Sequence, residues 1–309
     1  MIFIEDKKVD INRFPDGTLL LKEDIVLNYS NLDEITITWL YDNNEELVSL
    51  IFLTKHIRDS GISEINLKLP YIPNARQDRV KTDEDVFTLK YFADVINWLE
   101  FKSVEVLDPH SSVSEALINN IKVLSPEKYI LKAIDSIEEN MASNQSDDED
   151  SNQSYDGDSI QSDDEDSNQS YDGDSIQSDK SQKLLLFYPD EGAMKRYSGM
   201  VDRPFCFGIK NRDWQTGKIK DLMVSGDTDL IEGARVLIVD DISSRGGTFY
   251  HSALKLKELG AEELYLYVTH AENTILEGNV LKGDLFKKVY TTDSIFRKSH
   301  EKMEIFKLE

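Results

Sequence analysis

Short apolar runs alternate along this chain with longer segments in which apolar residues recur every three to four positions. The apolar runs predict strands at residues 35–39, 64–69, 103–107, 184–187, 236–239, 264–268, 289–292 and 303–306. The periodic segments predict helices at residues 44–58, 87–101 and 249–259. Strands that alternate with helices are typical of an α/β fold with mostly parallel sheets and helices on both sheet faces.

One predicted strand and the helix after it carry the strongest functional signal. Val236 to Val239 form a buried strand, Asp240 and Asp241 follow it, and a loop of small residues leads into the helix. In open α/β sheets ligands bind at the carboxyl ends of strands, and free N–H groups at a helix start bind phosphate. We therefore predict a sugar-phosphate site, in which the acids accept hydrogen bonds from ribose hydroxyls. Its predicted residues are Asp240, Asp241, Ser244, Arg245, Gly246, Gly247 and Thr248.

Length and composition limit the class of protein. A chain of 309 residues is long enough for two domains, each with its own core. Cys206 is the only cysteine, so no internal disulfide forms, which fits a reducing compartment. Neither a signal peptide nor a run of about eighteen apolar residues is present, so we expect a cytoplasmic protein without a membrane span. The net charge of −24 argues against non-specific nucleic-acid binding, which needs basic surface.

Much of the acidic charge lies in one repeated segment. The sequence of residues 146–161 recurs letter for letter at 162–177, and residues 143–182 hold thirteen acids and one base. Such a segment is too polar and too charged to form a core, so we predict a disordered insertion. It spans residues 141–182, between an N-terminal domain (1–140) and a C-terminal domain (183–309). A tolerated repeat expansion, weak binding of divalent cations and phosphorylation at Ser146 and Ser162 all stay open as its role.

Six segments in chain order resemble one family. They are Arg13-Phe-Pro-Asp-Gly17, Leu69-Pro-Tyr-Ile-Pro-Asn-Ala-Arg-Gln-Asp-Arg79, Leu107-Asp-Pro-His-Ser111, Tyr188-Pro-Asp-Glu-Gly-Ala-Met-Lys-Arg196, Ile209-Lys-Asn-Arg212 and the unit at 236–248. Together they resemble the ribose-phosphate pyrophosphokinases (PRPP synthetases), and they cover nearly all of the chain outside the insertion. Type I phosphoribosyltransferases share only the last segment, so the synthetase interpretation is favoured. The stretches at 87–90 and 108–111 are most similar to phage synthetase-like members.

The resemblance implies a fold and a reaction. The family has two phosphoribosyltransferase-like α/β domains with the active site at their junction, and it forms homodimers or larger homo-oligomers. It transfers the diphosphate of MgATP to the C1 hydroxyl of ribose 5-phosphate, which gives PRPP and AMP. ATP is therefore the expected co-substrate and Mg²⁺ the expected metal. Because the step is phosphoryl transfer, positioning and charge stabilisation should account for most of the catalysis.

The resemblance also implies roles for particular residues. By family position, Lys210 and Arg212 stabilise the transferring group, and His110 and Asp190 hold metal. The ATP-binding residues by the same argument are Arg76, Gln77, Phe14 and Asp16, of which Phe14 would stack on the adenine bound by a neighbouring subunit.

The chain departs from the family pattern at four places. Asn211 replaces a family arginine, and Thr18 replaces a family glutamate. The loop at 80–85 is acidic where the family is usually basic, which puts phosphate and ADP control in doubt. Ser244 and Arg245 stand where the family usually has Asp-Thr, so an acid is lost and a base gained beside the 5-phosphate.

The last departure motivates a second hypothesis about the acceptor. Some phage relatives pyrophosphorylate ADP-ribose for NAD salvage, and Arg245 would neutralise the second phosphate of that acceptor. Two further classes stay open, a phosphoribosyltransferase that needs no ATP and a noncatalytic regulatory homologue.

Overall fold

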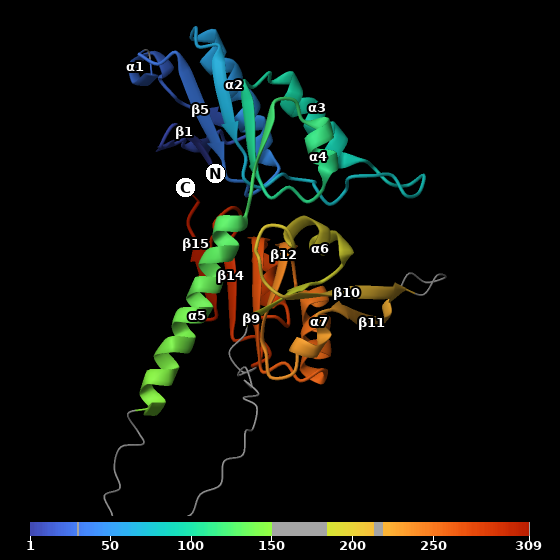
Figure 1. Cartoon of the computed structure of the whole chain (residues 1–309). Coiled ribbons are helices and arrows are strands. Elements are labelled where there is room, and N and C mark those ends of the chain that lie inside the picture. The colour runs from blue at the N-terminus through green and yellow to red at the C-terminus, as the bar shows by residue number, and fades with distance from the viewer. Residues whose placement is uncertain (30, 150–183, 213–218, 309) are drawn as a thin grey trace, which may run out of the picture.

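Two α/β domains make up the chain, as seen in a computed structural model (Figure 1). The structure describes residues 1–29, 31–149, 184–212 and 219–308, without the side chains of Val26 and of residues 141–149, 210–212 and 219–221. The predicted acidic insertion lies outside the described residues, except for the backbone of 141–149. No helix within the described ranges is long and apolar enough to cross a membrane.

The N-terminal domain is built on a six-stranded sheet in the order β2-β1-β5-β6-β7-β8. Its strands are β1 (Ile2–Ile4), β2 (Lys7–Lys8), β5 (Glu34–Trp39), β6 (Glu64–Lys68), β7 (Ser103–Leu107) and β8 (Ile121–Leu124). Its helices are α1 (Ile25–Tyr29), α2 (Glu45–Asp59), α3 (Thr88–Trp98) and α4 (Ser112–Leu117). Strands β5 to β8 are parallel, β1 is antiparallel to its neighbours, and β3 (Ile11–Arg13) and β4 (Leu19–Leu21) form a separate hairpin.

Helices cover one face of this first sheet, not both as predicted. Strands β5 to β8 follow one another in both sequence and space, so right-handed crossovers place α2, α3 and α4 on the same side. Along β5, Ile35 and Ile37 are buried in the core while Thr36 and Thr38 are half-buried. This alternation of apolar and polar residues is what a sheet with one covered face requires. The other face forms a wall of a cavity of about 530 Å³.

The C-terminal domain is built on a seven-stranded sheet in the order β11-β10-β9-β12-β13-β14-β15. Its strands are β9 (Leu184–Tyr188), β10 (Phe205–Arg212), β11 (Ile219–Gly226), β12 (Arg235–Ser243), β13 (Glu263–Ala271), β14 (Lys288–Thr292) and β15 (Met303–Phe306). Its helical elements are α6 (Glu191–Tyr197), η3 (Thr228–Leu230), α7 (Gly247–Glu258) and η4 (Asn273–Glu277). All neighbouring strands are parallel except β10 and β11.

Both faces of this second sheet are buried, which explains its continuous apolar runs. Along β9, Leu185 and Phe187 pack into the core that contains α7. Leu184, Leu186 and Tyr188 point the other way, into the core that contains α5 and α6. The two-domain, mostly parallel architecture is as predicted, but β10 and β11 were not predicted as strands.

Helix α5 (Glu127–Glu149) links the two domains and packs on the second one. Its residues Tyr129, Ile130, Ile134 and Ile137 are buried in the same core as Tyr267 of β13. Figure 1 shows the helix running along the outside of the second sheet. The domain boundary near residue 140 stays a prediction. It falls inside α5, and the packing of α5 groups this helix with the C-terminal domain.

Replacing Ile137 with Ala tests whether α5 is part of the second core. Ile137 is fully buried, so its truncation should lower the free energy of unfolding by about 2–5 kcal/mol through lost contacts and a cavity. Leu131 on the same helix is 40% exposed, so Leu131→Ala should cost roughly 0.5 kcal/mol or less. Urea unfolding followed by circular dichroism measures both. Equal losses for the two variants would contradict the packing of α5.

Candidate active site

The predicted sugar-phosphate unit lies where β12 ends and α7 begins. The strand is longer than predicted and continues through Asp240 and Asp241 to Ser243. Its pairing with β9 stops at Ile238, whereas its pairing with β13 continues to Ser243. The two acids therefore lie where one neighbouring strand has ended, which opens space beside them for a ligand.

A left-handed glycine turns the chain from β12 into α7. Gly246 has φ 71° and ψ 23° and is the N-cap residue of the helix. Residues with a Cβ atom rarely adopt this conformation, so the turn requires glycine. The helix start that follows presents N–H groups without intrahelical partners, which is the geometry of a phosphate site.

A second segment supports this loop from behind. The N–H of Glu272 donates to the carbonyl of Ser243 at 2.8 Å, just before the turn. Gly278 lies so close to the Arg245 carbonyl that a Cβ atom there would overlap it. A Cβ atom on Gly246 would likewise overlap the side chain of Val280. The shape of the phosphate loop is thus fixed by contacts with residues 272–280.

Asp241 is a buried anion between two cationic or polar groups. It is 4% exposed, and its Oδ2 lies 2.5 Å from His110 Nδ1 and 3.1 Å from Arg196 Nη1. Burial alone would raise the pKa of Asp241, but the hydrogen bond from His110 and the charge of Arg196 lower it to about 2. Burial and the neighbouring Asp241 instead raise the pKa of Asp240 well above its usual value. The pair therefore combines one fixed negative charge with one carboxyl group that resists ionisation.

Arg76 joins the predicted ATP-binding segment to the predicted sugar-phosphate loop. Its Nη1 donates to Ser244 Oγ at 2.7 Å, and its Nη2 pairs with the Glu272 carboxylate. The adjacent Gln77 accepts a hydrogen bond from Thr88 at 2.8 Å and lies outside the cavity described next. One side chain of the N-terminal domain thus reaches the loop of the C-terminal domain.

These groups surround a cavity of about 570 Å³ between the domains. Residues from both domains that the sequence analysis selected line it: Arg76, His110, Asp190, Asp240, Asp241, Ser244, Arg245, Gly246, Gly247 and Thr248. Arg196 also lines it and was missed, although it ends the Tyr188–Arg196 motif, six positions after the predicted metal residue Asp190. The cavity thus brings together the predicted ribose-phosphate and metal residues with one ATP-binding residue.

Two predicted ATP-binding residues lie elsewhere in the described chain. Phe14 and Asp16 are at the turn of the β3–β4 hairpin and do not line the cavity. Phe14 is 48% exposed, and hydrogen bonds from Thr18 lower the pKa of Asp16. The action of Phe14 on a neighbouring subunit stays a prediction.

The predicted catalytic cations lie on the hairpin of β10 and β11. The backbone of Lys210 pairs with Leu222, and that of Arg212 with Ile219, across an irregular register. The side chains of Lys210 and Arg212 lie outside the described residues, so their catalytic role stays a prediction.

Metal binding by His110 and Asp190 stays a prediction. Both line the cavity, and Asp190 caps α6 by accepting from the Ala193 N–H at 3.1 Å. Within the described part of the chain, no three His, Cys, Asp or Glu residues are close enough to hold a metal by themselves. Mg²⁺ commonly takes one or two carboxylates and completes its shell with water and substrate phosphates. The donors present fit that mode of binding.

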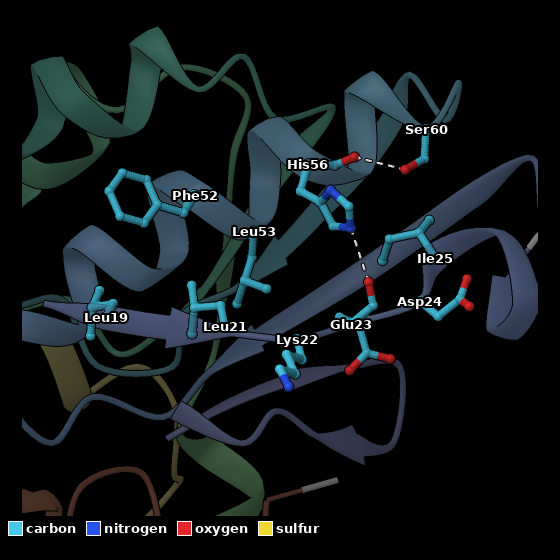
Figure 2. Close-up of a pocket in the computed structure, with 10 residues that line it drawn as sticks. All are labelled: Leu19, Leu21, Lys22, Glu23, Asp24, Ile25, Phe52, Leu53, His56 and Ser60. Atoms are coloured by element: carbon cyan, nitrogen blue, oxygen red, sulfur yellow. Dashed lines mark hydrogen bonds between the residues drawn. The ribbon is translucent and has the colours of Figure 1, made fainter. Parts of the chain in front are cut away.

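A larger cavity of about 720 Å³ lies between the β3–β4 hairpin and α2 (Figure 2). Its walls mix apolar side chains, Leu19, Leu21 and Phe52 among them, with charged ones that include two acids, Glu23 and Asp24. The His56 ring is occupied by a 2.9 Å hydrogen bond to the Glu23 carbonyl. Among the described residues that line it there is no arginine and no glycine turn. The cavity between the domains is therefore the better candidate for an anionic substrate.

The chain has the fold of phosphoribosylpyrophosphate synthetases. The crystal structure of that enzyme from Mycobacterium smegmatis matches it with a TM-score of 0.67, over 97% of this chain and 86% of that one, at 14% identity. In sequence the chain is similar to the ribose-phosphate pyrophosphokinase of Thermococcus kodakarensis, 25% identical over 269 residues (85% of this chain, 77% of the relative). That of Bradyrhizobium diazoefficiens is 24% identical over 295 residues (93% and 78%). No protein-family model matches the sequence. The predicted resemblance and the predicted class, an enzyme of the ribose-phosphate pyrophosphokinase type, are confirmed.

Proposed function

We propose that this chain transfers the diphosphate group of MgATP to the C1 hydroxyl of ribose 5-phosphate. The hydroxyl oxygen attacks the β-phosphorus of ATP, the bond from that phosphorus to the oxygen bridging the α-phosphate breaks, and AMP leaves with that oxygen. The observation that carries the proposal is the hydrogen bond from Arg76 to Ser244. It brings the predicted ATP-binding segment and the predicted sugar-phosphate loop together at one cavity. The names of the relatives support the same reaction.

The residues at the end of β12 suit the ribose end of the acceptor. In this proposal Asp240 and Asp241 accept hydrogen bonds from the ribose hydroxyls, and the ionised Asp241 holds the sugar beside Arg196. The N–H groups at the start of α7 bind the 5-phosphate, aided by Ser244 and Thr248. This leaves the C1 hydroxyl facing the interdomain side of the cavity, where Arg76 enters.

The donor side is proposed from the remaining groups. Arg76 and Gln77 hold ATP, and Lys210 and Arg212 neutralise charge on the diphosphate as it moves. Mg²⁺, held by His110 and Asp190 together with phosphate oxygens, would supply further charge neutralisation when bound. A homo-oligomer that brings Phe14 of one subunit to the adenine of another completes the proposed site.

Arg245 supports ADP-ribose as a second candidate acceptor. Its side chain lines the cavity, is 72% exposed and forms a 3.0 Å ion pair with Glu277, which is also exposed. An exposed ion pair of this kind exchanges partners at little cost. A guanidinium at the open side of the phosphate loop would suit an acceptor that continues beyond its 5-phosphate.

Arg245→Ala should separate the two acceptors. If ADP-ribose is the acceptor, removing this cation should raise its KM roughly tenfold, since about 1.4 kcal/mol of phosphate attraction is lost. With ribose 5-phosphate as the acceptor, KM should change less than about threefold, because the loop amides remain. Steady-state kinetics with each acceptor measures the effect, and Lys282→Ala, at an exposed cation that does not line the cavity, is the matched control.

The direct test is AMP release from MgATP with ribose 5-phosphate and ADP-ribose offered separately at equal concentration. Preference for ribose 5-phosphate supports the first proposal, and preference for ADP-ribose supports the second. If neither acceptor gives AMP, both are wrong, and a transferase or a noncatalytic homologue becomes the better interpretation.

A further inference from the structure

The residues that connect β7 to His110 are bonded to both domains. The N–H groups of Leu107 and Asp108 donate to the carbonyls of Pro70 and Leu124, within the N-terminal domain. We name Leu107 to His110 the junction strip. The Leu107 and His110 carbonyls and the side chains of Asp108 and His110 are bonded by side chains of the C-terminal domain. The strip therefore belongs structurally to both domains.

Asp108 is the centre of this strip. Its side chain is 3% exposed, and its backbone is left-handed, with φ 43°. Tyr197 of α6 donates its hydroxyl to the two carboxylate oxygens at 2.9 and 3.1 Å, and the hydroxyl of Thr269 on β13 donates to one of them. A buried carboxylate is costly unless it is hydrogen-bonded or paired, so these two hydroxyls, with Arg196 Nη1 at 3.9 Å, allow Asp108 to lie between the domains.

His270 of β13 holds the residue before Asp108. It is buried, and its Nε2 lies 3.0 Å from the Leu107 carbonyl. A carbonyl only accepts, so Nε2 carries the proton, and Nδ1 then accepts from the Ser294 hydroxyl at 2.7 Å. The ring orientation is thus determined from both sides, as in a rigid support.

The far end of the strip carries His110 to the active site. Its carbonyl accepts from Arg196, and its ring donates to Asp241 of β12. From Leu107 to His110, three different elements of the C-terminal domain, β13, α6 and β12, contact successive groups of the strip. A rotation of one domain against the other would therefore break hydrogen bonds between the strip and the C-terminal domain.

We propose that Tyr197, Thr269 and His270 are positioning residues, which hold the junction strip on the C-terminal domain and so set the place of His110 opposite Asp241. They act through Asp108 and Leu107 and do not themselves line the cavity of about 570 Å³. The role of His110 in holding Mg²⁺ near the reacting phosphates rests on the proposed function. The position of His110 opposite Asp241 does not depend on that function.

The test uses the full-length protein labelled with nitrogen-15 at its five histidines. The ring signals of His110 are identified by their loss in His110→Asn. Thr269→Val and Tyr197→Phe, which each remove one hydroxyl, should shift the His110 signals, while Thr269→Ser, which keeps its hydroxyl, should leave them in place. Unchanged His110 signals in both Thr269→Val and Tyr197→Phe would overturn the proposal, whatever the activity.

Kinetics then separates positioning from general stability. Thr269→Val should lower kcat for AMP release roughly tenfold, because displacing a catalytic group by up to about 1 Å costs up to roughly a hundredfold in rate. The acceptor KM should stay nearly unchanged. Thr54→Val is the matched control, because Thr54 is also buried and loses one hydrogen bond, to the Leu50 carbonyl, but lies on α2 away from the strip. It should lower the melting temperature without changing kcat or the His110 signals. If Thr54→Val reduces kcat as much as Thr269→Val, the effect is one of stability and the positioning role is wrong.

Discussion

Asp241→Asn is expected to lower kcat/KM for AMP release by roughly a hundredfold to a thousandfold, the usual effect of losing one preorganised electrostatic contact. Asn has nearly the same shape as Asp but carries no charge. Its substitution would leave the partly buried Arg196 without its closest anion, which lies at 3.1 Å. It would also place an amide N–H₂ group among donors, where a carboxylate accepts from His110 and, in the proposed complex, from ribose.

Steady-state kinetics with MgATP and ribose 5-phosphate measures this effect, and circular dichroism checks that the variant folds. Asp229→Asn, at an exposed acid in η3, is the control and should leave kcat/KM unchanged. A folded Asp241→Asn variant that keeps more than a third of its kcat/KM would remove Asp241 from the proposed site.

Gly278→Ala is expected to cost at least about a hundredfold in kcat/KM, because it displaces the phosphate loop. The added methyl group would overlap the Arg245 carbonyl, a backbone atom that has no rotamer by which to withdraw. The loop between β12 and α7 must therefore shift, which moves the N–H groups that would bind the 5-phosphate. Overpacking of this kind also destabilises the fold, typically by about 1–3 kcal/mol.

The same kinetics, with urea unfolding alongside, measures both effects of Gly278→Ala. Gly199→Ala is the matched control, since a Cβ atom there meets nothing within 4 Å and its backbone is not left-handed. Wild-type activity in Gly278→Ala would show that the close contact with Arg245 does not determine the loop shape.

The second sheet is the part of the fold that sequence predicts best. Its strands β9, β12 and β13 are buried on both faces, so each appears as an apolar run, and the acids after Val239 stand out against that run. The edge hairpin of β10 and β11 is less buried and was not predicted. The first sheet is harder, since its short strands β1, β2 and β8 have two to four residues and show no period. Helices cover only one face of this sheet because of its strand order, and strand order cannot be predicted from local sequence patterns.

Sequence analysis selects single residues and continuous segments of the candidate site, but not the contacts that form between them in the fold. Ser244 to Thr248 form a continuous loop, so their pattern was visible. The bond from Arg76 to Ser244 joins residues 168 positions apart, and that from Tyr197 to Asp108 joins residues 89 apart. No periodicity records such pairs. Asp108 and Arg196 belong to two of the six family-like segments, but only the structure shows that Asp108 accepts from Tyr197 and that Arg196 pairs with Asp241.

The position of the acidic repeats has a practical consequence. The C-terminal end of α5 and the start of β9 lie at the end of the second domain that faces away from the first (Figure 1). Leu184 pairs with Arg235 at the start of β12, whereas the cavity lies at the opposite end of that strand. The connection between α5 and β9 is thus a suitable place for an affinity tag, a fluorophore or a surface tether.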